Sequence, residues 1–90
     1  MNSSKYKDKI ASLPCVVCRH LGETGGAVSL HHVREGQGMG QRASDYLVVP
    51  LCFEHHQGPG GIHGLGTRGF EARYKLSELD LLALTIKAAN

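Results

Sequence analysis

The sequence predicts a small α+β domain in which helices flank a two-stranded finger stabilised by a bound metal. Three observations support this. Apolar residues recur at helical spacing near both ends of the chain, two segments rich in β-branched residues lie between them, and cysteine and histidine occur in two short half-sites. At 90 residues the chain is one domain by length, residues 1–90, without an internal repeat or linker. A domain this small buries little surface, so a metal is expected to add to its stability.

The first helix is predicted in "SSKYKDKIASL", with Ser3 or Ser4 as its N-cap and Pro14 beyond its end. The apolar residues at helical spacing are Tyr6, Ile10 and Leu13. The next segment, "PCVVCRH", is predicted to be a tight turn that carries two cysteines.

Two strands are predicted in the middle of the chain, in "AVSLHHV" and "DYLVVPLC". Pro50 in the second implies an edge strand or one that is about to end, because proline cannot donate to a strand ladder. The glycine-rich segment between them, "REGQGMGQRAS", reads as a flexible connection.

Helices are expected again in "TRGFEARYKL" and "SELDLLALTIKAAN". Ser77 and Asp80 have the spacing of a capping box at the start of the second. The residues expected to face the core from these helices are Phe70, Tyr74, Leu79, Leu82 and Ile86.

Composition limits the class of protein. The formal net charge is only +2 with neutral histidines, too small to indicate nucleic-acid binding by itself. Three cysteines do not suit a disulfide framework, and the first residues have no apolar run like that of a signal peptide. No segment has the length of a membrane span. We therefore expect no membrane association and a reducing, cytoplasmic setting in which cysteines serve as thiolate ligands.

Cys15-x-x-Cys18 is one half of a typical structural zinc site, because two intervening residues let both sulfurs reach one ion. Cys52-x-x-His55 repeats the same spacing and would complete a Cys3His site. His56 is the competing fourth ligand. The alternative interpretation is a set of buried thiols that bind nothing.

The remaining histidines, His31, His32, His56 and His63, exceed what one structural zinc requires. On a strand, His31 and His32 would point to opposite faces and should therefore have different roles. The alternative is one packed and one exposed imidazole without function.

In their order and spacing, "CVVC", "HH" and "LCFEHH" resemble the HNH, or ββα-metal, nucleases. The segment from residue 30 to residue 74 looks most like the phage-associated branch of RecA-dependent, recombination-enhancing nucleases. The resemblance implies a small zinc-stabilised ββα-metal (HNH) finger with flanking N- and C-terminal helices, acting as a metal-dependent DNA endonuclease. It also implies expression in the cytoplasm of a bacterial host, from a phage or prophage gene.

The resemblance also implies roles for individual residues. His32 matches the general base, and His31, His56 and His63 match ligands of one catalytic divalent ion. Asp45, or its neighbour Tyr46, lies near the family's middle Asn, which orients the base or braces the loop. Two departures are plain: that Asn is absent, and seven residues separate His56 from His63, where one helix face would favour four.

The ligand types leave the catalytic ion open among Mg²⁺, Mn²⁺, Ni²⁺ and Zn²⁺, although imidazoles favour the borderline metals. DNA is the expected partner, with a RecA-type recombinase filament as a second one. Three arginines are candidates for contacts with DNA phosphates: Arg34, Arg42 and Arg68. The alternative is that they are ordinary solvated surface charges. The competing function is a non-catalytic zinc module that binds DNA or a protein.

Overall fold

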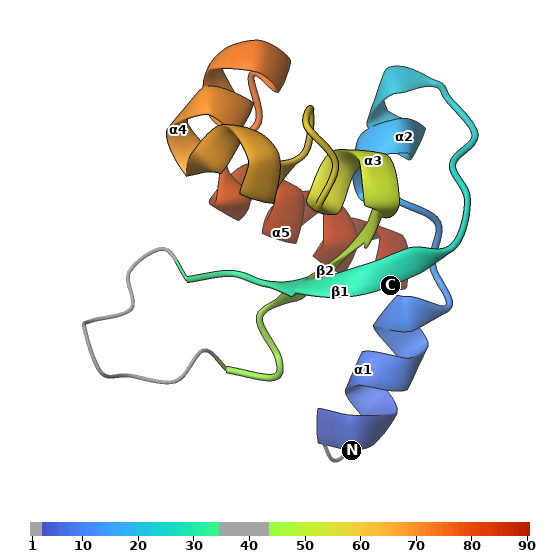
Figure 1. Cartoon of the computed structure of the whole chain (residues 1–90). Coiled ribbons are helices and arrows are strands. Elements are labelled where there is room, and N and C mark those ends of the chain that lie inside the picture. Colours follow the sequence, from blue (N-terminus) through green and yellow to red (C-terminus); the bar gives the residue numbers. More distant parts are fainter. Residues whose placement is uncertain (1–2, 35–43) are drawn as a thin grey trace.

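The computed structural model describes residues 3–34 and 44–90 of the chain, and there five helices surround a two-stranded antiparallel sheet (Figure 1). This confirms the predicted α+β class with helices at both ends. No helix in these ranges is both long enough and apolar enough to cross a membrane. The elements are α1 (Ser3–Ala11), α2 (Val16–Leu21), β1 (Val28–His32), β2 (Val48–Cys52), α3 (Phe53–His56), α4 (Ile62–Tyr74) and α5 (Glu78–Ala89).

The sheet forms the centre of the molecule. Strands β1 and β2 pair in a register that sets Leu30 opposite Pro50, and the Val33 amide donates to the Leu47 carbonyl at 2.8 Å just beyond. Every residue of β2 is buried, because α1, α2, α3 and α5 all contact this strand. Each described strand has only one neighbour, so β2 is an edge strand, as Pro50 predicted.

The Cys-x-x-Cys segment differs from the predicted tight turn. Cys15 immediately precedes α2, and its carbonyl accepts the Arg19 amide at 3.0 Å as the first turn of that helix forms. Gly22 ends the helix in the left-handed conformation, with φ of 76°. Residues three apart share a helix face, so the two thiols still lie on one side.

Helix α5 begins as predicted but has a different buried face. The Asp80 amide donates to the Ser77 hydroxyl at 3.1 Å and the Ser77 amide to the Asp80 carboxylate at 2.9 Å, which is a complete capping box. Leu79 and Ile86, expected in the core, are 53 % and 47 % exposed. The helix instead buries Glu78, Leu81 and Thr85, and Thr85 is accommodated because its hydroxyl donates to the Leu81 carbonyl.

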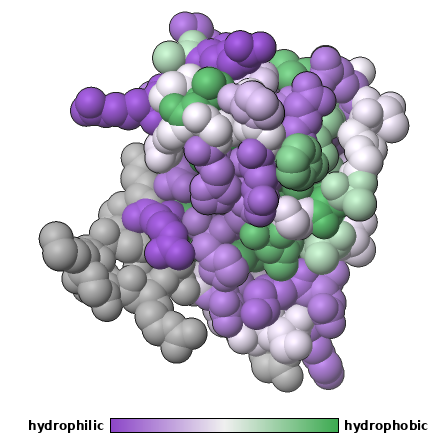
Figure 2. Space-filling view, viewed as in Figure 1, coloured by the Kyte–Doolittle hydropathy of each residue, from purple (hydrophilic) through white to green (hydrophobic). Residues whose placement is uncertain are grey.

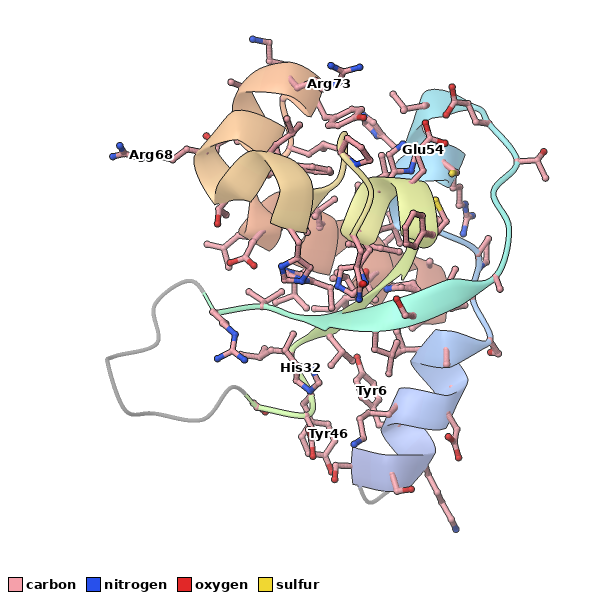
Figure 3. The ribbon with its side chains drawn as sticks, viewed as in Figure 1. Tyr6, His32, Tyr46, Glu54, Arg68 and Arg73 are labelled. Atoms are coloured by element: carbon pink, nitrogen blue, oxygen red, sulfur yellow. The ribbon has the colours of Figure 1, made fainter. Side chains whose placement is uncertain are left out.

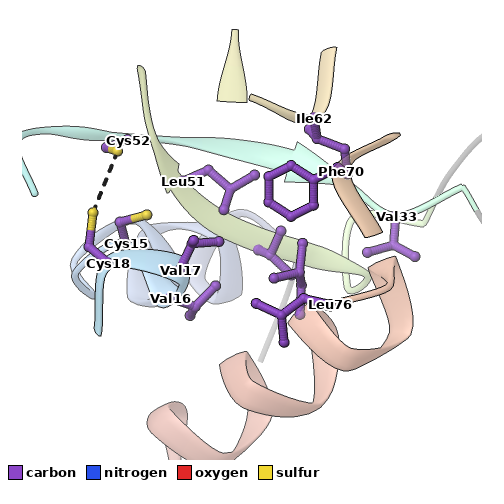
Figure 4. Packing of buried hydrophobic residues seen from close by; sticks show 12 residues of the cluster. Cys15, Val16, Val17, Cys18, Val33, Leu51, Cys52, Ile62, Phe70 and Leu76 are labelled. Carbon is purple, nitrogen blue, oxygen red and sulfur yellow. Dashed lines mark hydrogen bonds between the residues drawn. The ribbon is translucent and has the colours of Figure 1, made fainter. Parts of the chain in front are cut away.

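One hydrophobic cluster joins the sheet to the helices. Phe70 from α4, Leu51 from β2 and Leu81 from α5 are fully buried in it. Figure 4 shows the three cysteines gathered at one end of this cluster, beside Leu51 and α2. Any metal held there would therefore be part of the core.

Candidate metal centres

Three thiols and one imidazole converge where α2, β2 and α3 meet. The Nδ1 atom of His55 lies 3.7, 3.4 and 3.3 Å from the sulfurs of Cys15, Cys18 and Cys52, and the sulfurs of Cys18 and Cys52 are 3.7 Å apart. A tetrahedral zinc about 2.3 Å from each sulfur and about 2.1 Å from nitrogen would separate its ligands by roughly 3.5 to 3.8 Å. All four residues are buried. The cluster therefore has the donors and the spacing to hold a metal such as zinc.

The structure places His55, and not His56, among the thiols. Without a cation the Cys18 thiol resists ionisation: burial, reinforced by hydrogen bonds with Cys52 and Cys15, raises its pKa to about 12. A divalent ion would reverse this by stabilising the thiolates.

His31, His56 and His63 form a second cluster, which we call the histidine triad. Each offers a nitrogen, and these atoms all lie within 4.8 Å of one another. The Nε2 atoms of His56 and His63 are 3.1 Å apart, a separation suited to two ligands of one ion. His31 and His56 are buried while His63 is exposed. Three protein ligands with one open side would leave coordination positions for water or a substrate oxygen.

The seven-residue separation of His56 from His63 is explained by a chain reversal, because the two residues lie on different helices. His56 ends α3, residues 57–61 turn back, and His63 lies in the first turn of α4. The reversal is tight: a Cβ atom on Gly61 would lie 2.7 Å from the His56 carbonyl carbon. The close backbone approach that Gly61 permits thus lets the two imidazoles come together.

Two triad members have polar partners that the sequence analysis missed. The Ser29 hydroxyl lies 2.7 Å from Nδ1 of His56, and a Glu78 carboxylate oxygen lies 2.7 Å from Nε2 of His31. Ser29 could have been found, because it lies two residues before His31 and so shares its face of β1. Glu78 comes from α5, and no local pattern links it to the strand.

The environment keeps the buried triad members neutral. Burial lowers the pKa of His31, although the Glu78 carboxylate opposes this shift. Burial, with repulsion from His31 and His63, lowers the pKa of His56 to about 4. Neutral imidazoles have the lone pair that a metal needs, so these two side chains are ready to bind one near pH 7.

His32 leaves the opposite face of β1 and points toward Tyr46 and Tyr6 (Figure 3). It is about one-third exposed, and its Nε2 lies 3.1 Å from the Asp45 carboxylate. The hydrogen bond with His32, assisted by Lys7 at 3.7 Å, lowers the pKa of Asp45. The hydrogen-bond partner of His32 is therefore the Asp45 carboxylate.

An open groove connects these groups. The groove is lined by the three histidines of the triad together with His32 and Arg34. The adjacent residues His31 and His32 therefore reach the same groove, although their side chains leave opposite faces of the strand. Arg34 also lines a neighbouring depression together with Arg68, which projects outward from α4 (Figure 3). Hydrophilic residues cover much of the face that carries α3 and α4 (Figure 2). Arg42 lies outside the described residues.

A comparison with protein families identifies the chain. The family model described as recombination enhancement, RecA-dependent nuclease, matches residues 2–90. The chain belongs to this family, which confirms the resemblance to RecA-dependent, recombination-enhancing nucleases. A search of curated proteins found no match.

Proposed function

We propose that this member of the RecA-dependent nuclease family is a metal-dependent DNA endonuclease of the HNH type. The observation that carries the proposal is the histidine triad, which is separate from the Cys3His cluster and shares an open groove with His32. A zinc-binding module would need only the first cluster. The second offers three ligands and an open side, which is the arrangement of a catalytic metal.

The two clusters would have different roles. Cys15, Cys18, Cys52 and His55 would hold a structural zinc. The triad would hold one divalent ion, which supplies Lewis-acid stabilisation of charge on a phosphodiester. Imidazole ligands favour Mn²⁺, Ni²⁺ or Zn²⁺, while the open positions also admit Mg²⁺ with its waters.

His32 would act as the general base. Its Nε2 faces the Asp45 carboxylate, which accepts a hydrogen bond and so keeps the proton on that nitrogen. Nδ1 then has the lone pair that removes a proton from the attacking water. Asp45 would orient the ring, the role that the resemblance gives to the middle Asn.

Arg34 and Arg68 would contact DNA phosphates. Arg34 lines the groove that contains the triad, and both arginines line the neighbouring depression. Contacts to the backbone would bind DNA without regard to sequence. A role for Arg42, dependence on a RecA-type filament, and action in the cytoplasm of a phage host belong to the same proposal.

A cleavage assay tests the proposal. Zinc-loaded protein is incubated with supercoiled and single-stranded DNA, with Mg²⁺, Mn²⁺, Ni²⁺ or no added metal, and with or without a RecA filament. We expect cleavage that requires added metal and that falls about 10²- to 10⁴-fold in His32→Ala, because a general base contributes that much. His20→Ala is the matched control, since His20 is exposed on α2 and belongs to neither cluster.

The outcomes separate the candidate functions. A fully active His32→Ala protein would remove His32 from the mechanism. DNA binding without cleavage under every condition would favour the non-catalytic zinc module.

A further inference from the structure

Glu78 is a buried acidic residue that has no role in the mechanism proposed above. It is the first residue of α5 and only 5 % exposed. One carboxylate oxygen lies 2.7 Å from Nε2 of His31, and the other accepts the Arg34 backbone amide at 3.3 Å. Burying a carboxylate is costly unless hydrogen bonds and nearby positive potential compensate. The two contacts and the N-terminal end of the α5 dipole supply that compensation.

The contact with His31 has a chemical consequence. A carboxylate only accepts hydrogen bonds, so Nε2 of His31 carries the hydrogen of the neutral ring. Nδ1 is then the nitrogen with the lone pair, and only such a nitrogen can bind a metal. The Ser29 hydroxyl lies beside Nδ1 of His56, whose Nε2 faces His63; because a hydroxyl can donate or accept, this contact alone does not fix the tautomer of His56.

We propose that Glu78 is a positioning residue for the triad: it fixes the ring orientation and the tautomer of His31, so that Nδ1 is presented to the metal. The inference rests on the proposed metal site. It adds that α5, far from the triad in sequence, helps to determine its affinity. Glu78 acts through His31, because the described cluster of mutually close ligand atoms contains the three histidines and not this carboxylate.

The same carboxylate links the metal site to the groove. Its second oxygen fixes the backbone of Arg34, which lines both depressions beside the triad. A buried His31–Glu78 hydrogen bond that served only stability would also show these distances. The two interpretations differ in what happens to metal affinity and tautomer in a variant that still folds.

The test uses three variants of the zinc-loaded protein. In Glu78→Ala the acceptor is lost. In Glu78→Gln the charge is removed but an amide oxygen remains to accept from Nε2. Asp80→Asn is the matched control: Asp80 lies in the same first turn of α5, and the substitution removes the same charge without touching His31. Zinc content and far-UV circular dichroism establish that each variant is folded.

The first readout is calorimetric titration with Co²⁺. We expect Glu78→Ala to bind Co²⁺ roughly 10- to 100-fold more weakly than the wild type, as is found when other residues that orient metal ligands are removed. The Co²⁺ affinity of Glu78→Gln should lie between those of Glu78→Ala and the wild type. Asp80→Asn should bind Co²⁺ as tightly as the wild type. The absorption spectrum shows that Co²⁺ enters the imidazole site, because exchange into the thiol site would add sulfur-to-metal charge transfer.

The second readout is ¹⁵N NMR of the histidine rings before Co²⁺ is added. We expect the hydrogen of His31 on Nε2 in the wild type and in Glu78→Gln, and a tautomer mixture in Glu78→Ala. Unchanged Co²⁺ affinity and an unchanged tautomer in Glu78→Ala would overturn the inference alone. If the wild type itself bound no Co²⁺ beyond its zinc, the proposed metal site would fail, and this inference with it. If Glu78→Ala did not fold, a Glu78→Gln protein with a mixed tautomer would overturn the inference.

Discussion

His31 and His32 are neighbours in the chain, yet the strand gives them different surroundings. His31 faces the helices and is buried against Glu78, whereas His32 is on the other face, partly exposed beside Asp45. In both, the nitrogen beside the carboxylate is Nε2, which leaves Nδ1 with the lone pair. In the proposed mechanism this one tautomer would serve a metal ligand on one face of the strand and a proton acceptor on the other.

The unusual acidity of His56 predicts a measurable pH dependence. Its pKa is lowered from 6.5 to about 4, so the ring stays neutral in the folded protein down to that pH. The unfolded chain binds the proton already near pH 6.5. The contribution of neutral His56 to the free energy of unfolding is therefore complete above pH 6.5 and is lost as the pH falls toward 4.

NMR measures this directly, because the ring resonances of His56 report its own protonation even where acid also affects bound zinc. In zinc-loaded protein without a second metal, we expect the His56 resonances to titrate with a midpoint near 4. A midpoint close to 6.5 would mean that neither burial nor the neighbouring rings act on His56 as the structure implies.

At the scale of elements, the junction of α3 and α4 determines whether the two clusters can exist side by side. Adjacent histidines in α3 serve different clusters, His55 among the thiols and His56 in the triad. A chain reversal over only five residues then returns His63 to His56. This requires very close approach of the backbone, which glycine permits.

Two neighbouring glycines test this junction. A Cβ atom on Gly61 would lie 2.7 to 2.8 Å from backbone atoms of His55 and His56, whereas one on Gly60 would meet its nearest neighbour, the Tyr74 hydroxyl, at 3.5 Å. We expect Gly61→Ala to lower the free energy of unfolding by roughly 1–3 kcal/mol, because backbone must shift, and to weaken metal binding at the triad.

Gly60→Ala should leave both properties close to those of the wild type, since 3.5 Å is an ordinary contact. Urea unfolding and Co²⁺ titration of the two variants measure the difference. Equal stability and equal affinity in Gly61→Ala and Gly60→Ala would show that the close approach at Gly61 is not required.

At the scale of the whole molecule, the sequence predicted what depends on local spacing. The half-sites at Cys15 and Cys52, the strand that separates His31 from His32, and the α5 capping box are all patterns within a few residues. The choice between His55 and His56 could not be made, because it depends on the direction in which a one-turn helix leaves β2.

The prediction of which α5 residues are buried was wrong for a related reason. Leu79 and Ile86 fit an apolar stripe, but the contacts of α5 with β2 and α2 bury Leu81 and Thr85 instead. Glu78 lies on the same buried face of α5 and contacts His31. Such partners, distant in sequence, depend on tertiary packing, and periodicity cannot reveal them.

The position of the Cys3His cluster inside the core predicts what would follow from removing a zinc ion bound there. Three sulfurs occupy one end of the hydrophobic cluster, so an empty site leaves them without the cation that their positions favour. Structural zinc contributes roughly 10–16 kcal/mol in small zinc domains, as much as or more than the whole stability of about 5–15 kcal/mol typical of folded proteins. We therefore expect Cys15→Ala, or a strong chelator, to unfold the domain.

His63→Ala provides the matched comparison, because His63 is exposed and lies only in the triad. It should keep one bound zinc and wild-type far-UV circular dichroism while it loses affinity for a second metal. Circular dichroism with zinc quantification follows both variants, and returning Zn²⁺ to the chelated wild type should restore its spectrum. A chelated protein that kept a cooperative thermal transition would contradict the structural role, and would mean that the core formed by Phe70, Leu51 and Leu81 is sufficient to hold the fold.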